Sequence, residues 1–255
     1  MEIPKIIHYI WLGGNPKSEE INRAINTWRK HAPEFKIVEW NEIKLKRLME
    51  DDVFYQNALS NHNYAYASDQ ARLEILKKYG GVYMDTDMHL LVDPCEYLAD
   101  RELVLCFQNT SNLNDEVIET SFIACIPNFP LITELLDVYK NMTYDVQNLT
   151  PNSELLGPLI FKKYRLDHNK RTQSRLEDKV IIYSSDIFWQ PTFKSVAIHV
   201  GLKSWGELNS RDKIRIFLRK RINNRFEASI FQLGSNSILL LNKIKRKLKH
   251  RGEKN

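Results

Sequence analysis

The sequence predicts an α/β fold built on an open sheet, and two observations support that prediction. Short apolar runs rich in β-branched residues alternate with longer segments in which apolar residues recur at helical spacing. The 255 residues, 43% hydrophobic and 27% charged, suffice for one large domain with its own core. Because the sequence shows no internal repeat or low-complexity linker, we expect a domain at residues 1–210 and a basic helical appendage at residues 211–255.

The amino-terminal half is expected to alternate strands and helices. Ser18 is a suitable amino-terminal helix cap, and Gly80 is suited to end a helix. Polar residues at 51–62 predict irregular structure. In order, we expect a strand at residues 5–11, a helix at 18–31, a strand at 35–40, a short helix after Asn41 and a helix at 64–79.

The second half continues the same alternation. A proline inside a helix removes a hydrogen bond, so the helix that follows the loop at residues 143–153 is expected to begin only at Pro158. The other expected elements are an extended segment at 89–92, a turn or short helix after Asp93, strands at 103–107 and 121–126, a helix at 127–142, strands at 180–183 and 196–200, a loop at 201–206, and basic helices beyond it.

Charge is distributed unevenly along the chain. Residues 211–255 carry 14 Lys and Arg against 3 Asp and Glu, a net charge of +11, whereas the preceding residues carry 23 against 29, a net charge of −6. Three cysteines, Cys95, Cys106 and Cys125, lack metal-ligand spacing and predict buried thiols in a reducing compartment. The sequence shows neither a signal-peptide pattern nor an apolar stretch of about 18 residues, so we expect a cytoplasmic protein that does not span a membrane.

Two carboxylates follow the most buried-looking strand. Asp85 and Asp87 come directly after the apolar run at residues 82–84, and residues two apart in an extended strand point the same way. Their like charges repel each other unless a cation lies between them, and oxygen ligands at such a position suit Mg²⁺ or Mn²⁺. The alternative is an exposed turn with two solvated aspartates.

A second pair of charges lies on the preceding helix. Asp69 and Arg72 are three residues apart, hence on one helical face, and the chain reverses at Gly80 and Gly81 to run back along that helix. This places the pair near the two aspartates. The alternative is a surface ion pair, which contributes less than about 1 kcal/mol.

Residues 68–87 carry the pattern S-D-x-x-R followed by G-G-x-Y-x-D-x-D. This segment resembles the signature of the DXD-motif sugar transferases of glycosyltransferase family 32, which the related glucosylating bacterial toxins share. Weaker similarities to the family lie at residues 3–14, 27–33 and 197–205, so the resemblance spans about residues 3–206.

The resemblance implies a GT-A fold, a Rossmann-like α/β/α sandwich with a mixed sheet. It also implies a nucleotide-sugar donor, a divalent cation (Mn²⁺ or Mg²⁺) and retention of anomeric configuration. Trp11 would stack on the donor base, Asp69 and Arg72 would hold sugar hydroxyls and a phosphate, and Ser204 and Trp205 would close over the donor. The implied donor-binding residues are Trp11, Asp69, Arg72, Tyr83, Asp85, Ser204 and Trp205; the implied catalytic residues are Asp69, Arg72, Asp85, Asp87 and Trp205; the implied metal ligands are Asp85, Asp87 and His199.

The alternative for His199 is a structural role, since a histidine in an apolar strand also serves such roles. No residue identifies itself as a covalent nucleophile, so we expect front-side attack by the acceptor, with the leaving phosphate taking the proton. UDP-sugars are expected ahead of GDP-sugars as donors. The resemblance favours a glycan acceptor, lipid-linked, in bacterial capsular or surface polysaccharide synthesis. Glu119, Asp115 and Glu154 are candidate acceptor contacts by position alone.

Two other functions remain open. A phosphotransferase of the haloacid dehalogenase type also uses a strand followed by D-x-D, but it requires a threonine where this chain has His89, and it uses the first strand. A basic nucleic-acid-binding protein would account for the charge of residues 211–255. That segment interleaves Leu, Ile and Phe with its cations and lacks a recognition motif, so we expect no nucleic acid partner.

The basic segment instead has the pattern of interfacial helices. Ile214, Phe217, Leu218 and Ile222 are expected on one helical face, and a second amphipathic helix is expected at about residues 237–251. Lys and Arg border both apolar stripes. We therefore expect residues 211–255 to bind an anionic membrane surface at the inner face of the cytoplasmic membrane, the alternative being that the stripes pack on the domain.

Overall fold

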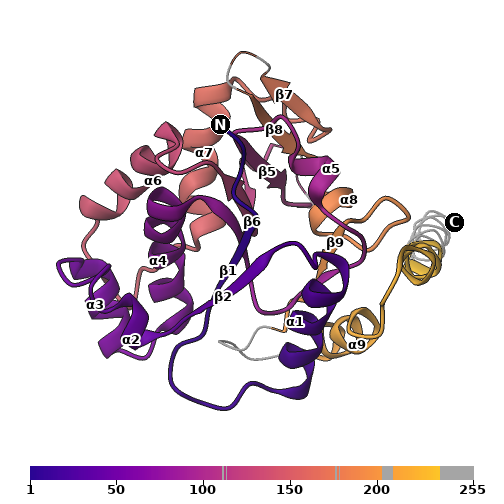
Figure 1. The fold of residues 1–255 in the computed structure, drawn as a ribbon, viewed down its shortest axis with the longest axis horizontal. Coiled ribbons are helices and arrows are strands. Elements are labelled where there is room, and N and C mark those ends of the chain that lie inside the picture. The colour runs from indigo at the N-terminus through magenta and orange to yellow at the C-terminus, as the bar shows by residue number, and fades with distance from the viewer. Residues whose placement is uncertain (111, 113, 176, 178, 203–208, 236–255) are drawn as a thin grey trace, which may run out of the picture.

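The main sheet has seven strands in the part of the chain that the computed structural model describes, which is all of residues 1–255 except 111, 113, 176, 178, 203–208 and 236–255 (Figure 1). Strands β1, β2, β3, β5 and β8 run in one direction, and β6 and β7 run in the opposite direction. The expected mixed sheet is thereby confirmed. Across the sheet the order is β2 (Lys36–Trp40), β1 (Ile6–Ile10), β3 (Gly81–Met84), β6 (Ile118–Cys125), β5 (Leu103–Phe107), β8 (Val180–Tyr183) and β7 (Gln173–Arg175).

Helices cover both faces of this sheet, because its central strands are apolar on both sides. Along β3, for example, Tyr83 packs into one core and Val82 and Met84 into the other. The first core lies under α2 (Glu42–Leu45), α3 (Val53–Ser60), α4 (Tyr64–Tyr79), α6 (Pro130–Lys140) and α7 (Asn152–Tyr164). The second lies under α1 (Glu19–His31), α5 (Cys95–Leu98) and α8 (Ser185–Phe188), on the other side of the sheet in Figure 1.

A small second sheet joins distant parts of the chain. Strand β4 (Met88–Leu90) pairs antiparallel with β9 (Ala197–His199), and Met88 lies opposite His199. Helix α1 holds this sheet in place, because the indole N–H of Trp28 donates a hydrogen bond to the Met88 carbonyl at 2.7 Å. The pairing brings the end of β9 next to the turn that follows β3.

Several expected boundaries are wrong: β6 begins at Ile118 rather than at residue 121, and α6 begins at Pro130 rather than at residue 127. Two further differences are larger. Residues 51–62 contain helix α3, whose first turn is capped by Asp52 and whose Phe54, Tyr55 and Ala58 are buried. Helix α7 begins at Asn152 and continues through Pro158. A proline inside a helix costs about 3 kcal/mol, but burial of Leu156, Ile160 and Phe161 contributes about 1.5–3 kcal/mol each. The buried face therefore outweighs the proline. The sequence prediction also missed β7 and α8, both of which are short.

Beyond β9, helix α9 (Ser210–Arg219) and a helix at residues 225–235 lie at one side of the molecule (Figure 1). Ile222, between them, packs with Leu91, Ile198 and Ala228 in a small third core. Ile222 is therefore not part of the predicted exposed stripe, whose other members lie on α9. The predicted helix at 237–251 falls outside the described residues. Across the described part of the chain, no helix combines the length and apolarity needed to cross a membrane.

Candidate active site

Asp85 and Asp87 lie in a tight turn between β3 and β4. The Asp85 carbonyl accepts a hydrogen bond from the Met88 N–H at 3.0 Å, and the Asp85 N–H donates to the Ser121 carbonyl at 2.9 Å. The expectation that the pair shares one face of an extended strand is therefore wrong, because β3 ends at Met84. The turn, together with β6 beside it, fixes where the two carboxylates lie.

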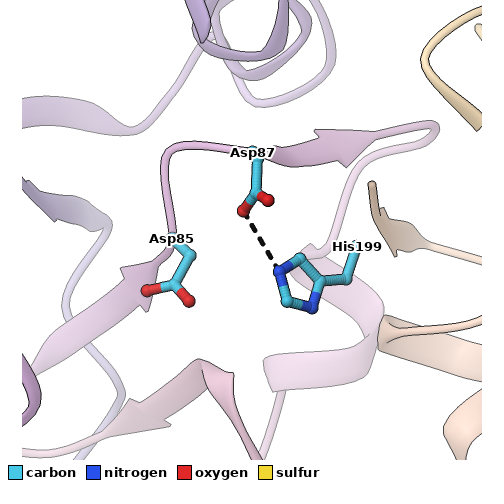
Figure 2. Close-up of side chains that lie close together, drawn as sticks. All are labelled: Asp85, Asp87 and His199. Atoms are coloured by element: carbon cyan, nitrogen blue, oxygen red, sulfur yellow. Dashed lines mark ion pairs between the residues drawn. The ribbon is translucent and has the colours of Figure 1, made fainter. Parts of the chain in front are cut away.

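His199 completes a three-residue cluster with these aspartates (Figure 2). One potential ligand atom from each of Asp85, Asp87 and His199 lies within 4.8 Å of the others, and the three side chains point toward a common space. His199 Nε2 is 3.1 Å from Asp87 Oδ1. Burial by itself opposes both charges, but their mutual attraction and hydrogen bond dominate. They lower the pKa of Asp87 to about 2 and raise the pKa of His199 to about 9.

The donor set of this cluster fits a divalent cation. Two carboxylates and an imidazole suit Mn²⁺, and the carboxylates also suit Mg²⁺. In the structure the positive charge of His199 lies beside Asp87. A divalent cation bound here would replace the positive charge of His199 beside Asp87, because a metal-bound imidazole must be neutral. His199 thus lies where the sequence predicts a metal ligand.

Asp69 and Arg72 form an ion pair that reaches the same turn. Arg72 Nη2 lies 2.7 Å from Asp69 Oδ1 and 3.5 Å from Asp85 Oδ1. Arg72 is buried, its Nη1 donates to the Thr120 carbonyl at 2.6 Å, and its guanidinium lies 4.5 Å from the centre of the Tyr83 ring. The guanidinium is therefore engaged by the protein on several sides, and in this structure Arg72 positions Asp69 and Asp85.

The carboxyl group of Asp69 lies in a strongly desolvated place. Burial raises the pKa of Asp69 to about 6, against the lowering effect of Arg72. The Tyr83 hydroxyl donates to Asp85 Oδ1 at 2.8 Å, and burial raises the pKa of Tyr83 well above its ordinary value. The predicted residues Asp69, Arg72, Tyr83, Asp85, Asp87 and His199 are thus brought together around one turn.

Three contacts of this site were not predicted. Asn152, the first residue of α7, donates its backbone N–H to Asp69 Oδ2 at 3.4 Å. Trp189 Nε1 lies 3.2 Å from His199 Nδ1, and Glu119 Oε1 lies 3.8 Å from the same nitrogen. Glu119 is buried beside a predicted metal ligand, although the sequence suggested it only as an acceptor contact. These contacts join segments that no local sequence pattern connects.

The predicted donor-binding residue Trp11 lies at the same edge of the sheet as this turn. Trp11 directly follows β1, which runs parallel to β3, so Trp11 and Asp85 emerge at the same edge of the sheet. The Trp11 indole N–H donates to the Asn15 carbonyl at 2.7 Å, and Lys17 Nζ lies 5.6 Å from the ring centre. Ser204 and Trp205 lie outside the described residues.

Residues 18–105 match a protein-family model described as the glycosyltransferase sugar-binding region containing DXD motif. These residues are thus similar to the sugar-binding region of the DXD glycosyltransferases. This region includes Asp69, Arg72, Asp85 and Asp87. The resemblance of residues 68–87 to the DXD-motif sugar transferases is confirmed for this region.

Two similar proteins are fungal mannosyltransferases. Inositol phosphoceramide mannosyltransferase 1 of Schizosaccharomyces pombe is 31% identical over 93 residues, which are 34% of this chain and 28% of that protein. Mannosyl phosphorylinositol ceramide synthase SUR1 of Saccharomyces cerevisiae is 28% identical over 178 residues, which are 64% of this chain and 43% of that protein. The chain therefore spans less than half the length of either relative.

A solved structure shares the fold of this chain. The PaToxG glycosyltransferase superposes with a TM-score of 0.50 at 19% sequence identity, over 64% of this chain and 70% of that one. At this identity the similarity concerns the fold alone. It confirms the expected GT-A fold.

Proposed function

We propose that the protein transfers a hexose from a nucleoside diphosphate sugar to a glycan acceptor, with a divalent cation at Asp85, Asp87 and His199. The single observation that carries the proposal is the convergence of this cluster with the buried Asp69–Arg72 pair. The cluster offers ligands for a cation that also binds diphosphate, and Asp69 offers a carboxylate beside it. When bound, the cation supplies Lewis-acid stabilisation of the departing diphosphate.

The residues of the chain have separate tasks in this proposal. Asp85, Asp87 and His199 hold the cation, while Arg72 keeps Asp69 and Asp85 in place through its contacts with both. Asp69 accepts hydrogen bonds from donor-sugar hydroxyls, and Trp11 stacks on the base with about 1–3 kcal/mol. Ser204 and Trp205 are proposed to exclude water from the donor.

Front-side attack with retention remains our proposal for the stereochemistry. The acceptor hydroxyl then approaches from the face that the diphosphate leaves, and the leaving phosphate oxygen accepts the hydroxyl proton. An α-linked donor would give an α-linked product. The anomeric coupling in the NMR spectrum of the product tests this, and a β-linked product would exclude it.

We propose a lipid-linked glycan as the acceptor. The names of the two fungal relatives state that they act on a phosphoinositol ceramide, which is a lipid. A lipid-linked acceptor is also compatible with the expected role in bacterial capsular or surface polysaccharide synthesis. For the donor we retain the preference for UDP-sugars, to be tested directly against GDP-sugars, since the relatives by name transfer mannose.

The function is tested with a donor screen. The purified protein is incubated with UDP- and GDP-sugars, including GDP-mannose, in the presence of Mn²⁺, and released nucleoside diphosphate is measured. One sugar should give metal-dependent release that Asp87→Asn abolishes. Release of phosphate from phosphomonoesters, without turnover of any nucleotide-sugar, would instead favour the phosphotransferase alternative and overturn the proposal.

A further inference from the structure

We propose that helix α9 and the helix at residues 225–235 form a docking surface for an anionic lipid bilayer. We call this the docking surface and define it by six large apolar side chains that are 46–74% exposed to solvent: Ile214, Phe217, Leu218, Phe226, Ile230 and Leu233. The two helices lie side by side, because Ile214 and Leu218 line a pocket together with Phe231 and Ser235. Several exposed large apolar side chains on neighbouring helices mark a site of interaction more often than single ones do. The proposal goes beyond sugar transfer and does not require it.

The outer face of α9 combines apolar and cationic residues. Lys213, Ile214, Phe217 and Leu218 are exposed positions at the spacing of one helical face, and the exposed Arg221 follows two residues after the helix ends. The guanidinium of Arg221 lies 3.4 Å from the centre of the Phe217 ring, so the cation borders the apolar residues directly. An apolar stripe with cations at its edge is the arrangement of a helix that lies in the interface of a membrane.

The helix at residues 225–235 repeats this division between an inner and an outer face. Its inner residues Ala228 and Phe231 pack with Ile222 in the third core, whereas Phe226 and Ile230 point outward. The alternative, in which apolar residues of this segment pack on the domain, therefore holds for Ile222, Ala228 and Phe231 but not for Phe226 and Ile230. The first three side chains pack against the domain, and the other two are exposed to solvent.

The two helices are firmly attached to the rest of the protein. Lys220 Nζ lies 2.7 Å from Glu20 Oε1 on α1, and Arg225 Nε donates to the Ser195 carbonyl at 2.9 Å. Arg219 donates to the carbonyl of His199, a proposed metal ligand, at 2.8 Å. A membrane bound at the docking surface would thus be held in a fixed relation to the active site.

Charge favours a bilayer with anionic lipids over other partners. The net charge of residues 211–255 is +11, whereas that of the preceding residues is −6. The sequence after Ser235 continues with ILLL and then seven Lys and Arg. Cations near an anionic leaflet attract the protein to it, and the acidic remainder of the protein would be repelled. An anionic surface therefore binds and orients the protein through this end.

The inference is tested by co-sedimentation of the full chain with vesicles. Wild-type protein should pellet with vesicles of phosphatidylcholine mixed with phosphatidylglycerol, should stay in solution with phosphatidylcholine alone, and should be released by high salt. The variant Phe217→Ser/Phe226→Ser/Ile230→Ser should bind at least about tenfold more weakly because its apolar contacts are lost. Lys213→Gln/Arg221→Gln should also bind about tenfold more weakly.

Matched controls lie on and next to α2, on the other side of the molecule (Figure 1). Ile43 is 85% exposed, and Lys46 and Arg47 are exposed. Ile43→Ser and Lys46→Gln/Arg47→Gln should bind vesicles like the wild type. Equal loss in the control and surface variants, or undiminished binding by the surface variants, would overturn the proposal. So would a wild-type dimer that ignores vesicles and becomes monomeric in the apolar variant, because the surface would then bind a second copy.

Discussion

His199 Nε2 and Asp87 Oδ1 lie 3.1 Å apart, although one belongs to the last strand of the fold and the other to the turn after β3. The antiparallel pairing of β4 with β9 creates this proximity. The binding of a cation at this cluster therefore depends on how the carboxy-terminal part of the domain packs against the turn after β3.

Asp87→Asn should abolish transfer without unfolding the protein. The amide keeps the size of the side chain and can still bond to the Leu202 N–H, which lies 2.7 Å from Asp87 Oδ2. It removes the charge that a divalent cation needs, so we expect at least about a hundredfold loss of turnover. Nucleoside diphosphate release measures the activity, and circular dichroism checks the fold. Near-normal turnover at saturating Mn²⁺ would refute the metal site. EDTA should abolish nucleoside diphosphate release by the wild type, and added Mn²⁺ should restore this activity.

Arg72→Lys should impair both stability and activity. Lysine keeps the charge, but it cannot reproduce the separate contacts of the guanidinium with Asp69, Asp85 and the Thr120 carbonyl. We expect the free energy of unfolding to fall by about 1–3 kcal/mol, since a buried polar group loses its partner. Urea unfolding measures this. Unchanged stability with reduced turnover would instead indicate that Arg72 acts on the donor phosphate.

Glu119→Gln should weaken metal binding through His199. A metal-bound Nε2 requires the imidazole proton on Nδ1, and Glu119 Oε1 is the acceptor near that nitrogen. Glutamine is a poorer acceptor, so we expect the affinity for Mn²⁺ to fall by about tenfold in calorimetric titration. Trp189→Phe removes a donor that competes for Nδ1 and should leave the affinity unchanged or higher. Equal losses in both variants would indicate packing damage.

The buried His8 should make stability depend on pH. Its Nδ1 accepts from the Trp40 indole at 3.0 Å, its Nε2 lies 3.0 Å from the Gly80 carbonyl, and burial lowers its pKa from 6.5 to about 4. The unfolded chain therefore binds this proton first, and stability is lost as the pH falls from about 6.5 towards 4. The contribution at neutral pH is about 3 kcal/mol.

Chemical denaturation of the wild type and His8→Gln across this pH range checks the prediction. The variant is expected to be less stable at neutral pH, but its free energy of unfolding should change less steeply below pH 6.5. Parallel pH profiles would show that His8 is not the responsible group.

Gly157→Ala should destabilise the protein. A Cβ at this position of α7 would lie 1.8 Å from the carbonyl oxygen of Glu116, so helix or loop must shift. Overpacking of this kind costs about 1–3 kcal/mol. Gly234→Ala is the matched control in another helix, because a Cβ there meets nothing within 4 Å. Thermal unfolding should separate the two variants, and equal midpoints would contradict the close packing of α7.

Local chemistry in the sequence determined most of the fold. Helix α4 has the predicted bounds because its interior lacks glycine and proline and Gly80 follows it. Ser18 caps α1 and Asn41 caps α2 as expected. The two strands that pair in parallel with β1, which are β2 and β3, lie where the sequence predicts strands. The spacing of Asp69 and Arg72 predicted their pairing, and the S-D-x-x-R and D-x-D patterns predicted the family. These features depend on residues a few positions apart.

Only the tertiary structure decided how the site closes. Whether His199 lies beside Asp85 and Asp87, whether Glu119 lies beside His199 and whether Asn152 reaches Asp69 depend on the pairing of β4 with β9 and on the packing of α7, since contacts between distant segments leave no periodicity in the sequence. The same holds for residues 214–233, where an apolar pattern fits either burial or exposure. Tertiary packing alone separated buried Ile222 from exposed Phe217, because each surface of the domain can accommodate only the side chains that face it.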